Sequence, residues 1–152
     1  MSASQETDAV TGSPIRTLGR WALAIGLGFA GIGHFSNAQA FRAQVPNWMP
    51  WPEAVIAVSG VIELALALAL LVLPRWRTQV GWVVAGFFIV VFPGNISQFV
   101  TQTSAFGLDS DLLRGVRLLF QPLLVVWALW CTGAWRSWRH RSESASPTSP
   151  QN

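Results

Sequence analysis

Long uncharged stretches dominate the hydropathy pattern of this chain. No Asp, Glu, Lys or Arg occurs over residues 21–41, 78–108 or 118–135, and residues 54–74 contain a single charge, Glu63. Apolar runs of about 18 residues or more are long enough to cross a bilayer as helices. A soluble domain of this size must wet its surface and rarely carries four such runs. We therefore predict an all-α, polytopic membrane protein, a four-transmembrane-helix bundle.

The predicted membrane domain covers residues 15–136. Its four spans are expected at residues 15–35, 53–73, 78–100 and 111–135. Residues 1–14 are polar and rich in Ser, Thr and Ala, whereas residues 137–152 are first basic and then rich in Ser and Pro. Such compositions cannot bury enough apolar surface to fold, so both ends are predicted to be disordered.

The charged residues of the chain define an orientation. Of all residues, 51% are hydrophobic and 11% are charged, against a usual charged share of about a quarter. The formal net charge is +3 and every basic residue is an arginine. Seven of the ten arginines flank one side of the predicted spans and three flank the other. Because positive residues favour the cytoplasmic side, we predict a multi-pass protein of the bacterial inner membrane with both termini cytoplasmic and no nucleic-acid partner.

The first span is rich in small residues. Ala22, Gly26 and Ala30 form a stripe at four-residue spacing, with His34 one step further. Stripes of this kind let helix backbones approach closely in lipid, so tight helix packing is expected along this face. An alternative interpretation is a signal peptide cleaved after residues 38–40, Ala-Gln-Ala, which would leave three spans.

The segment between the first two spans is predicted to lie at the membrane surface. Ser36 and Gln39 fit a capping box, which favours a short helix starting there. Three prolines then keep the chain extended, and Trp48 and Trp51 suit the headgroup region; the prolines are Pro46, Pro50 and Pro52.

Glu63 is the most informative single residue, because it lies near the middle of the second span. A carboxylate at that depth costs roughly 2.5–3.5 kcal/mol on insertion scales. Glu63 must therefore face other helices and be neutral or paired. Ser59, four residues earlier, extends the same face.

Further polar residues of the spans fall in the same, outer half of the predicted bilayer. They form, with Glu63, a candidate buried polar network or ligand pocket: Glu63, Arg117, His34, Asn95, Gln121, Gln98 and Ser59. Within this set we predict that Glu63 pairs with Arg117, with His34 nearby. The network could be a structural device that fixes helix register, or a site for a ligand, a quinone or a proton.

Two prolines lie at the same level of the bundle. Pro93 removes a helix hydrogen bond and frees the carbonyl of Ile89, and Pro122 does the same for Leu118. A freed carbonyl at membrane depth needs a cavity, water or a side-chain donor. A small polar pocket that opens outward is therefore expected.

Other chemistry is sparse in the sequence. Cys131, the single cysteine, lies in an apolar run and is predicted to be buried. Bis-histidine haem ligation is excluded because His140 lies in the basic tail and leaves His34 alone in the spans. No metal-ligand spacing and no nucleophile signature is found, so catalytic residues stay unassigned.

Several short segments, in order, resemble the DoxX family of small bacterial membrane proteins, in particular its DoxX-like branch. They are Gly31-Ile32-Gly33-His34-Phe35, Phe41, Val45-Pro46, Pro50-Trp51-Pro52, Ser59-Gly60-Val61-Ile62-Glu63, Pro74-Arg75-Trp76-Arg77, Val91-Phe92-Pro93-Gly94-Asn95-Ile96, Arg117-Leu118-Leu119-Phe120-Gln121 and Val126-Trp127-Ala128. One departure is Gly94, where relatives often carry alanine; it is expected only to loosen the kink at Pro93.

The resemblance implies a four-helix membrane fold and a short list of functions. A few members resemble membrane subunits of oxidoreductase systems, including a thiosulfate:quinone oxidoreductase, and others are linked to oxidative-stress complexes. We therefore expect a membrane subunit of a quinone-linked oxidoreductase or oxidative-stress system, with a non-covalently bound quinone and a soluble or membrane redox partner. The alternatives are a non-enzymatic scaffold or accessory protein, and a small transporter or proton path that would need a homo-oligomer.

Overall fold

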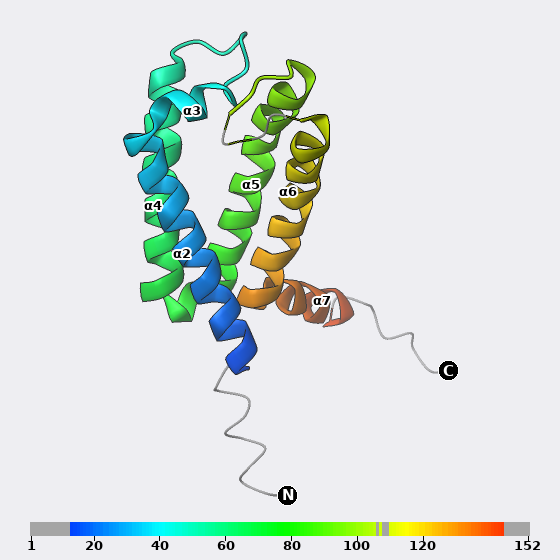
Figure 1. The fold of residues 1–152 in the computed structure, drawn as a ribbon. Coiled ribbons are helices and arrows are strands. Elements are labelled where there is room, and N and C mark those ends of the chain that lie inside the picture. Colours follow the sequence, from blue (N-terminus) through cyan, green and yellow to red (C-terminus); the bar gives the residue numbers. More distant parts are fainter. Residues whose placement is uncertain (1–12, 106, 108–109, 145–152) are drawn as a thin grey trace, which may run out of the picture.

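A computed structural model describes residues 13–105, 107 and 110–144, and all regular secondary structure in these residues is helical. Four long helices lie side by side, and the last helix turns across one end of them (Figure 1). In chain order the elements are α2 (Pro14–Ser36), α3 (Ala38–Arg42), α4 (Pro52–Val72), the 3₁₀ turn η1 (Pro74–Trp76), α5 (Arg77–Val100), α6 (Asp111–Thr132) and α7 (Ala134–Ser144).

The charge-free stretches locate the long helices closely. Helices α2, α4 and α5 begin and end within one residue of the first three predicted spans. The fourth prediction, residues 111–135, extends too far. Helix α6 ends at Thr132 because Gly133 adopts a left-handed conformation, with φ of 75°, and caps it.

Three helical segments of the described chain are long and apolar enough to cross a membrane: Pro52–Val72, Pro74–Val100 and Asp111–Thr132. Helix α2 has 23 residues and is about 34 Å long at 1.5 Å per residue, which is also span-like. It is not among these three segments, and it contains five glycines, two arginines and His34. Its outer face is nevertheless apolar and exposed, through Ile15, Leu18, Trp21, Ile25, Phe29 and Ile32.

The two chain ends differ from their predictions where they are described. Pro14 already begins α2, and residues 1–12 of the predicted disordered segment lie outside the described residues. At the other end, helix α7 extends to Ser144, so the tail predicted to be disordered from residue 137 is helical over its first part. Trp135 and Trp138 are about half exposed on α7, with ring centroids 6.2 Å apart. Alternating tryptophans and arginines are typical of a helix that lies in a membrane interface.

The segment between α2 and α4 contains the expected short helix, but the predicted capping box is wrong. Ser36 is the last residue of α2, and Asn37 precedes α3 without capping it through its side chain. Helix α3 is therefore held by tertiary contacts instead. Phe41 stacks on His34 at a centroid distance of 3.8 Å, and Arg42 forms an ion pair with Glu53.

Glycines set the two closest helix contacts. A Cβ on Gly60 of α4 would lie 2.7 Å from the Cβ of His34 on α2, and one on Gly31 would lie 2.8 Å from Leu64. A Cβ on Gly81 of α5 would lie 2.0 Å from Thr132 Oγ1 on α6. The bundle is therefore two tightly packed pairs, α2 with α4 and α5 with α6.

The predicted small-residue stripe is not a packing face. A Cβ on Gly26 would have nothing within 4 Å, and Ala22 and Gly26 are both exposed. Close packing of α2 runs instead through Gly31, which faces α4 at Gly60. Rotation of α2 about its own axis decides which row of glycines meets a neighbour, and small residues occur on both rows.

The apolar core fills the half of the bundle nearest α7, which we call the inner half. Its buried side chains come from all four long helices: Leu23, Ala24, Leu27, Leu66, Ala67, Leu70, Val80, Val84, Ala85, Phe88, Ala128, Leu129 and Cys131. Cys131 is 4% exposed, as predicted. The other half, nearest α3, is the outer half, and it holds the buried polar side chains other than Thr132.

Candidate functional site

Six of the seven residues predicted to form a polar network line one cavity of about 640 Å³ in the outer half. All four long helices and the segment after α3 contribute to its wall, and most of the lining is apolar. The predicted residues on the wall are His34, Ser59, Glu63, Asn95, Arg117 and Gln121. Residues separated by up to 87 positions in the sequence thus meet at one site, as their expected depth indicated.

His34 and Glu63 form the ionisable centre of the cavity. His34 Nε2 lies 3.4 Å from Glu63 Oε2, and each residue is 9% exposed. The contact exists because Gly60, one turn before Glu63, lets the backbone of α2 approach α4. The predicted pairing of Glu63 with Arg117 is therefore corrected. His34 is the partner that the structure records for Glu63, and Arg117 lines the same cavity from α6.

Asn95 and Gln121 form a hydrogen-bonded chain across α5 and α6. Asn95 Nδ2 donates to Gln121 Oε1 at 2.9 Å, and Gln121 Nε2 donates to the carbonyl of Phe88 at 2.6 Å. This donor serves the carbonyl of Phe88 and not that of Ile89, the carbonyl that Pro93 was predicted to free. The amide of Gln121 thus accepts one hydrogen bond and donates another, and it joins the two helices.

Gln98 lies outside the cavity lining, although it is only 1% exposed. Its Nε2 donates to the carbonyl of Thr103 at 3.3 Å, so it secures the chain that follows α5. Arg114, also buried, contacts Asp111 one turn earlier at 2.6 Å. Both residues stabilise the outer end of the α5–α6 pair.

Three polar atoms of the wall are buried without a hydrogen-bond partner among the described residues: His34 Nδ1, Glu63 Oε2 and Gln44 Nε2. Buried polar atoms are paired in most proteins, because an unpaired one costs roughly 1–3 kcal/mol. All three belong to residues that line the same cavity. The cavity therefore presents one amide donor, one imidazole nitrogen and one carboxylate oxygen to whatever occupies it.

Gln44 was not predicted as a site residue; it lies in the segment over residues 43–49, at the outer end of the cavity. Its carbonyl oxygen would be 2.5 Å from a Cβ on Gly94, so this backbone rests directly on α5. Gly94 was expected only to loosen the Pro93 kink. Its role in the structure is to admit the segment, and a glycine directly after a helix proline was the available signal.

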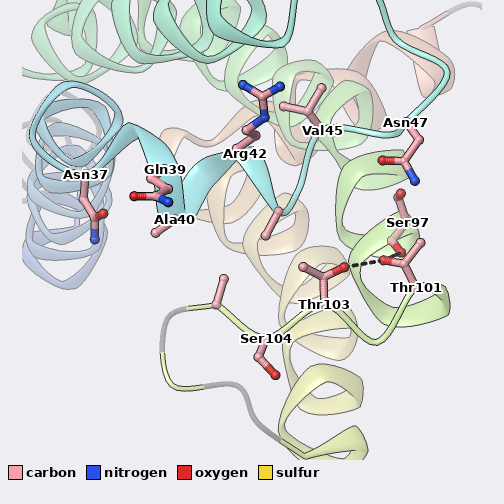
Figure 2. A pocket seen from close by; sticks show the side chains of 12 residues that line it. Asn37, Gln39, Ala40, Arg42, Val45, Asn47, Ser97, Thr101, Thr103 and Ser104 are labelled. Atoms are coloured by element: carbon pink, nitrogen blue, oxygen red, sulfur yellow. Dashed lines mark hydrogen bonds between the residues drawn. The ribbon is translucent and has the colours of Figure 1, made fainter.

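A second, more polar hollow of about 580 Å³ lies on the other side of this segment (Figure 2). Ala43 and Asn47 face it, whereas Gln44 and Pro46 face the first cavity. Its floor carries hydroxyl groups, and the hydroxyls of Thr101 and Thr103 lie 2.7 Å apart. The segment over residues 43–49 is thus a thin wall between an apolar cavity and a polar surface hollow.

Metal binding has no candidate in the described part of the chain, where no group of three or more His, Cys, Asp or Glu side chains is placed to hold an ion. The site is accordingly one of hydrogen-bonding groups in apolar surroundings.

Comparison with known proteins gives one family. Residues 23–132, which include all four long helices in whole or in part, match the family described as a domain of unknown function, DUF8561. No curated protein and no solved structure matches the chain.

Proposed function

This chain belongs to the DUF8561 family, and from that premise we propose that it is a four-span protein of the bacterial inner membrane that binds a quinone in its outer cavity. In this proposal it is the membrane subunit of a quinone-linked oxidoreductase or oxidative-stress system. A soluble or membrane redox partner supplies the remaining redox centres.

Its surface supports membrane insertion. Large apolar side chains are exposed along the whole length of the bundle, including Phe29 at 81% and Val90 at 75%. Arginines 16, 20, 75, 77, 136 and 139 lie at the inner end, together with the start of α2 and with α7 (Figure 1). This distribution favours an inner end in the cytoplasm. A reporter fused to the C-terminus that is active only outside the cell would contradict the orientation.

The observation that carries the proposal is a set of three buried polar atoms in one apolar cavity that make no hydrogen bond among the described residues; one of them, Glu63 Oε2, faces His34 Nε2 at 3.4 Å. A scaffold protein would be expected to satisfy its buried polar groups internally and to fill its interior. A ligand with carbonyl or hydroxyl oxygens on a flat ring and an apolar remainder matches the wall in both respects. Quinones have this composition and exchange between carbonyl and hydroxyl forms on reduction.

Each unpaired atom has a role in holding such a ring. Gln44 Nε2 is a donor suited to a ring carbonyl, and Glu63 Oε2 is an acceptor suited to a ring hydroxyl. His34 can donate or accept through Nδ1, while its Nε2 faces the carboxylate of Glu63 at 3.4 Å. A proton can therefore be held between His34 and Glu63 beside the bound oxygen. Phe41, stacked on His34, keeps water from the outer surface away from this pair.

We also propose kinship with the DoxX family, on the basis of the segments quoted above. The residues that carry the cavity chemistry, His34 and Glu63, both lie within those segments, and Gln44 directly precedes one of them. A quinone-linked membrane subunit would place this chain among the functions that this resemblance implies.

Binding to purified protein in lipid nanodiscs tests the proposal. A benzoquinol with a decyl tail, the reduced form that carries ring hydroxyls, should bind the wild-type protein, and Glu63→Gln should weaken its binding about tenfold, because the carboxylate that accepts a hydrogen bond from a ring hydroxyl is lost. Glu53→Gln is the matched control, because this substitution makes the same chemical change on the exposed surface, outside the cavity.

Native purification followed by mass spectrometry provides the second readout. We expect a co-purified quinone that is depleted in Glu63→Gln and retained in Glu53→Gln. A wild-type protein that carries no quinone and binds none in nanodiscs would overturn the proposal and favour the scaffold alternative.

A further inference from the structure

We propose that the ligand of the outer cavity is a long-tailed, membrane-dissolved amphiphile, which enters sideways from the bilayer between α2 and α6 and leaves its apolar tail in that gap. The inference rests on the proposed function for the identity of the head group. It adds the route, the class of ligand and the residues that bind the tail.

Helices α2 and α6 touch at the inner end of the bundle and separate toward the outer end. A Cβ on Gly19 would lie within 3.1–3.3 Å of Trp127, Trp130 and Cys131 of α6. Two turns further along α2, about 10 Å away at 1.5 Å per residue, a Cβ on Gly26 would meet nothing within 4 Å. Figure 1 shows the same divergence, with α2 crossing near α6 at the inner end and joining α4 above it. The gap is thus a wedge that widens toward His34 and Glu63.

Residues that line the cavity are exposed along both edges of this wedge. On α2, Ala22 and Gly26 are exposed and Ala30 is half-buried. On α6, Phe120 is 52% exposed and Leu124 is half-buried. Together with the separation of α2 from α6, this exposure on both facing helices places an opening of the cavity between them. At this depth the surface of the bundle faces the apolar interior of the bilayer in the proposed membrane arrangement.

Packed side chains and backbone narrow the two ends of the cavity. At the outer end, the backbone of Gln44 rests on Gly94 and Phe41 covers His34. At the inner end, Leu23, Leu27 and Phe88 belong to the apolar core and are at most 6% exposed. A water-soluble ligand would have to cross the segment over residues 43–49, whereas a lipid-dissolved ligand reaches the opening directly.

The chemistry changes along the wedge in the order that an amphiphile requires. Near its outer end stand the side chains of His34 and Glu63, 10% and 12% exposed, whose Nδ1 and Oε2 atoms make no hydrogen bond among the described residues. Toward the inner end the walls carry small and apolar groups, Ala22 and Gly26 against Leu124 and Trp127. A polar ring bound at the top therefore leaves a chain of isoprene or methylene units in the lower wedge. The absence of side chains at Gly26 keeps that path open.

The test compares two probes on two matched glycine variants in nanodiscs. The probes are a dimethoxy-methyl-benzoquinone with a decyl tail and the same ring without a tail. Gly26→Trp fills the wedge; Gly86→Trp on α5 is the control, since Gly86 has equally open space and does not line the cavity. Thermal unfolding of each variant confirms folding, and Ala22→Trp is a second blocking variant should Gly26→Trp fail to fold.

We expect Gly26→Trp to weaken binding of the tailed probe at least tenfold relative to wild type while the tail-less ring changes less than about twofold. Gly86→Trp should leave both affinities at the wild-type value. Equal affinity of Gly26→Trp and wild type for the tailed probe would overturn the lateral route. Failure of both probes to bind the wild-type protein would instead overturn the proposed function on which the route depends, so the two failures are distinguishable.

A tailed probe with a photoreactive diazirine at its end locates the tail directly. Labelled peptides should come from residues 19–30 of α2 and 120–127 of α6. Labelling centred on Val90 of α5, the most exposed residue of the cavity lining, would place the opening elsewhere and overturn the assignment to α2 and α6.

Discussion

The inner and outer halves of the bundle use the same four helices for different purposes. In the inner half, facing side chains are Leu, Ala, Val and Phe, and Leu70 and Val84 are 1% and 0% exposed. In the outer half, the same helices present His34, Glu63, Asn95 and Gln121 around a cavity. The second region surrounds a cavity whose wall carries three polar atoms without a hydrogen-bond partner among the described residues. Stability is therefore concentrated at one end of each helix, which permits a costly and incompletely packed site at the other.

This division of roles predicts that the largest loss of stability comes from disrupting the contact between α5 and α6 in the inner half. Gly81→Leu places a side chain where Thr132 Oγ1 already lies 2.0 Å from a Cβ position. Neither backbone can yield without parting α5 from α6, so we expect about 3 kcal/mol of destabilisation. Unfolding in a mixed-micelle denaturant titration measures it. A change below about 1 kcal/mol would show that this contact is not as rigid as its geometry indicates.

Truncation of the inner core should have the next largest effect. Leu70→Ala removes a side chain that is 1% exposed and leaves an unfilled space among Leu66, Ala67 and their neighbours. We expect the free energy of unfolding to fall by about 2 kcal/mol. This is at the lower end for such truncations, because lipid can cover the apolar helix surface that is exposed when the helices separate. The same titration gives the value. Affinity for the tailed benzoquinone should be unchanged, and a parallel loss of affinity would contradict the separation of the two halves.

Removing the interhelical hydrogen bonds of the outer half should cost less. Gln121→Leu leaves the carbonyl of Phe88 and the amide of Asn95 without their partner, at a similar side-chain volume. Interhelical hydrogen bonds in membranes are worth about 0.6 kcal/mol each, so a loss of about 1 kcal/mol is expected. The double variant with Asn95→Leu should be less destabilised than the sum of the two single variants, because the two residues share one bond. Additive effects would rule out that coupling.

The smallest effect, and one of opposite sign, is expected on the open face of α2. Gly26→Ala should stabilise the protein by up to about 0.5 kcal/mol, because alanine favours helix and nothing obstructs its methyl group. Gly31→Ala, on the face of α2 that packs against α4, should destabilise the protein, since a Cβ there would lie 2.8 Å from Leu64. Thermal unfolding of the two variants side by side sharpens the boundary between packed and open faces. Equal shifts for both would contradict it.

Much of the site was predictable from depth alone. Counting residues along each predicted span placed His34, Glu63, Asn95, Arg117 and Gln121 in the same half of the bundle, and the structure brings all five to one cavity. Contact between particular residues was not predictable in the same way. Depth does not report which way a helix is rotated, so the partner of Glu63 is His34 and not the expected Arg117.

Gln44 shows a second limit. Nothing in the segment after α3 distinguishes this residue in the sequence, and its importance arises because Gly94, 50 positions later, admits its backbone. Helix α7 was missed for a related reason. Its mixture of arginines and tryptophans is polar on average, and the helical face that gathers the tryptophans becomes evident only once Gly133 has turned the chain.

The sequence by itself determined the helical class, the bounds of three of the four long helices and the depth of each polar residue. These follow from local properties: charge-free length, caps and the cost of placing a carboxylate among apolar residues. Tertiary structure decided which glycines pack, which polar atoms meet and where the cavity opens. Those outcomes depend on helix rotation and on the divergence of α2 from α6. Both are set by steric contacts between residues that are distant in the chain, so they produce no periodic pattern in the sequence.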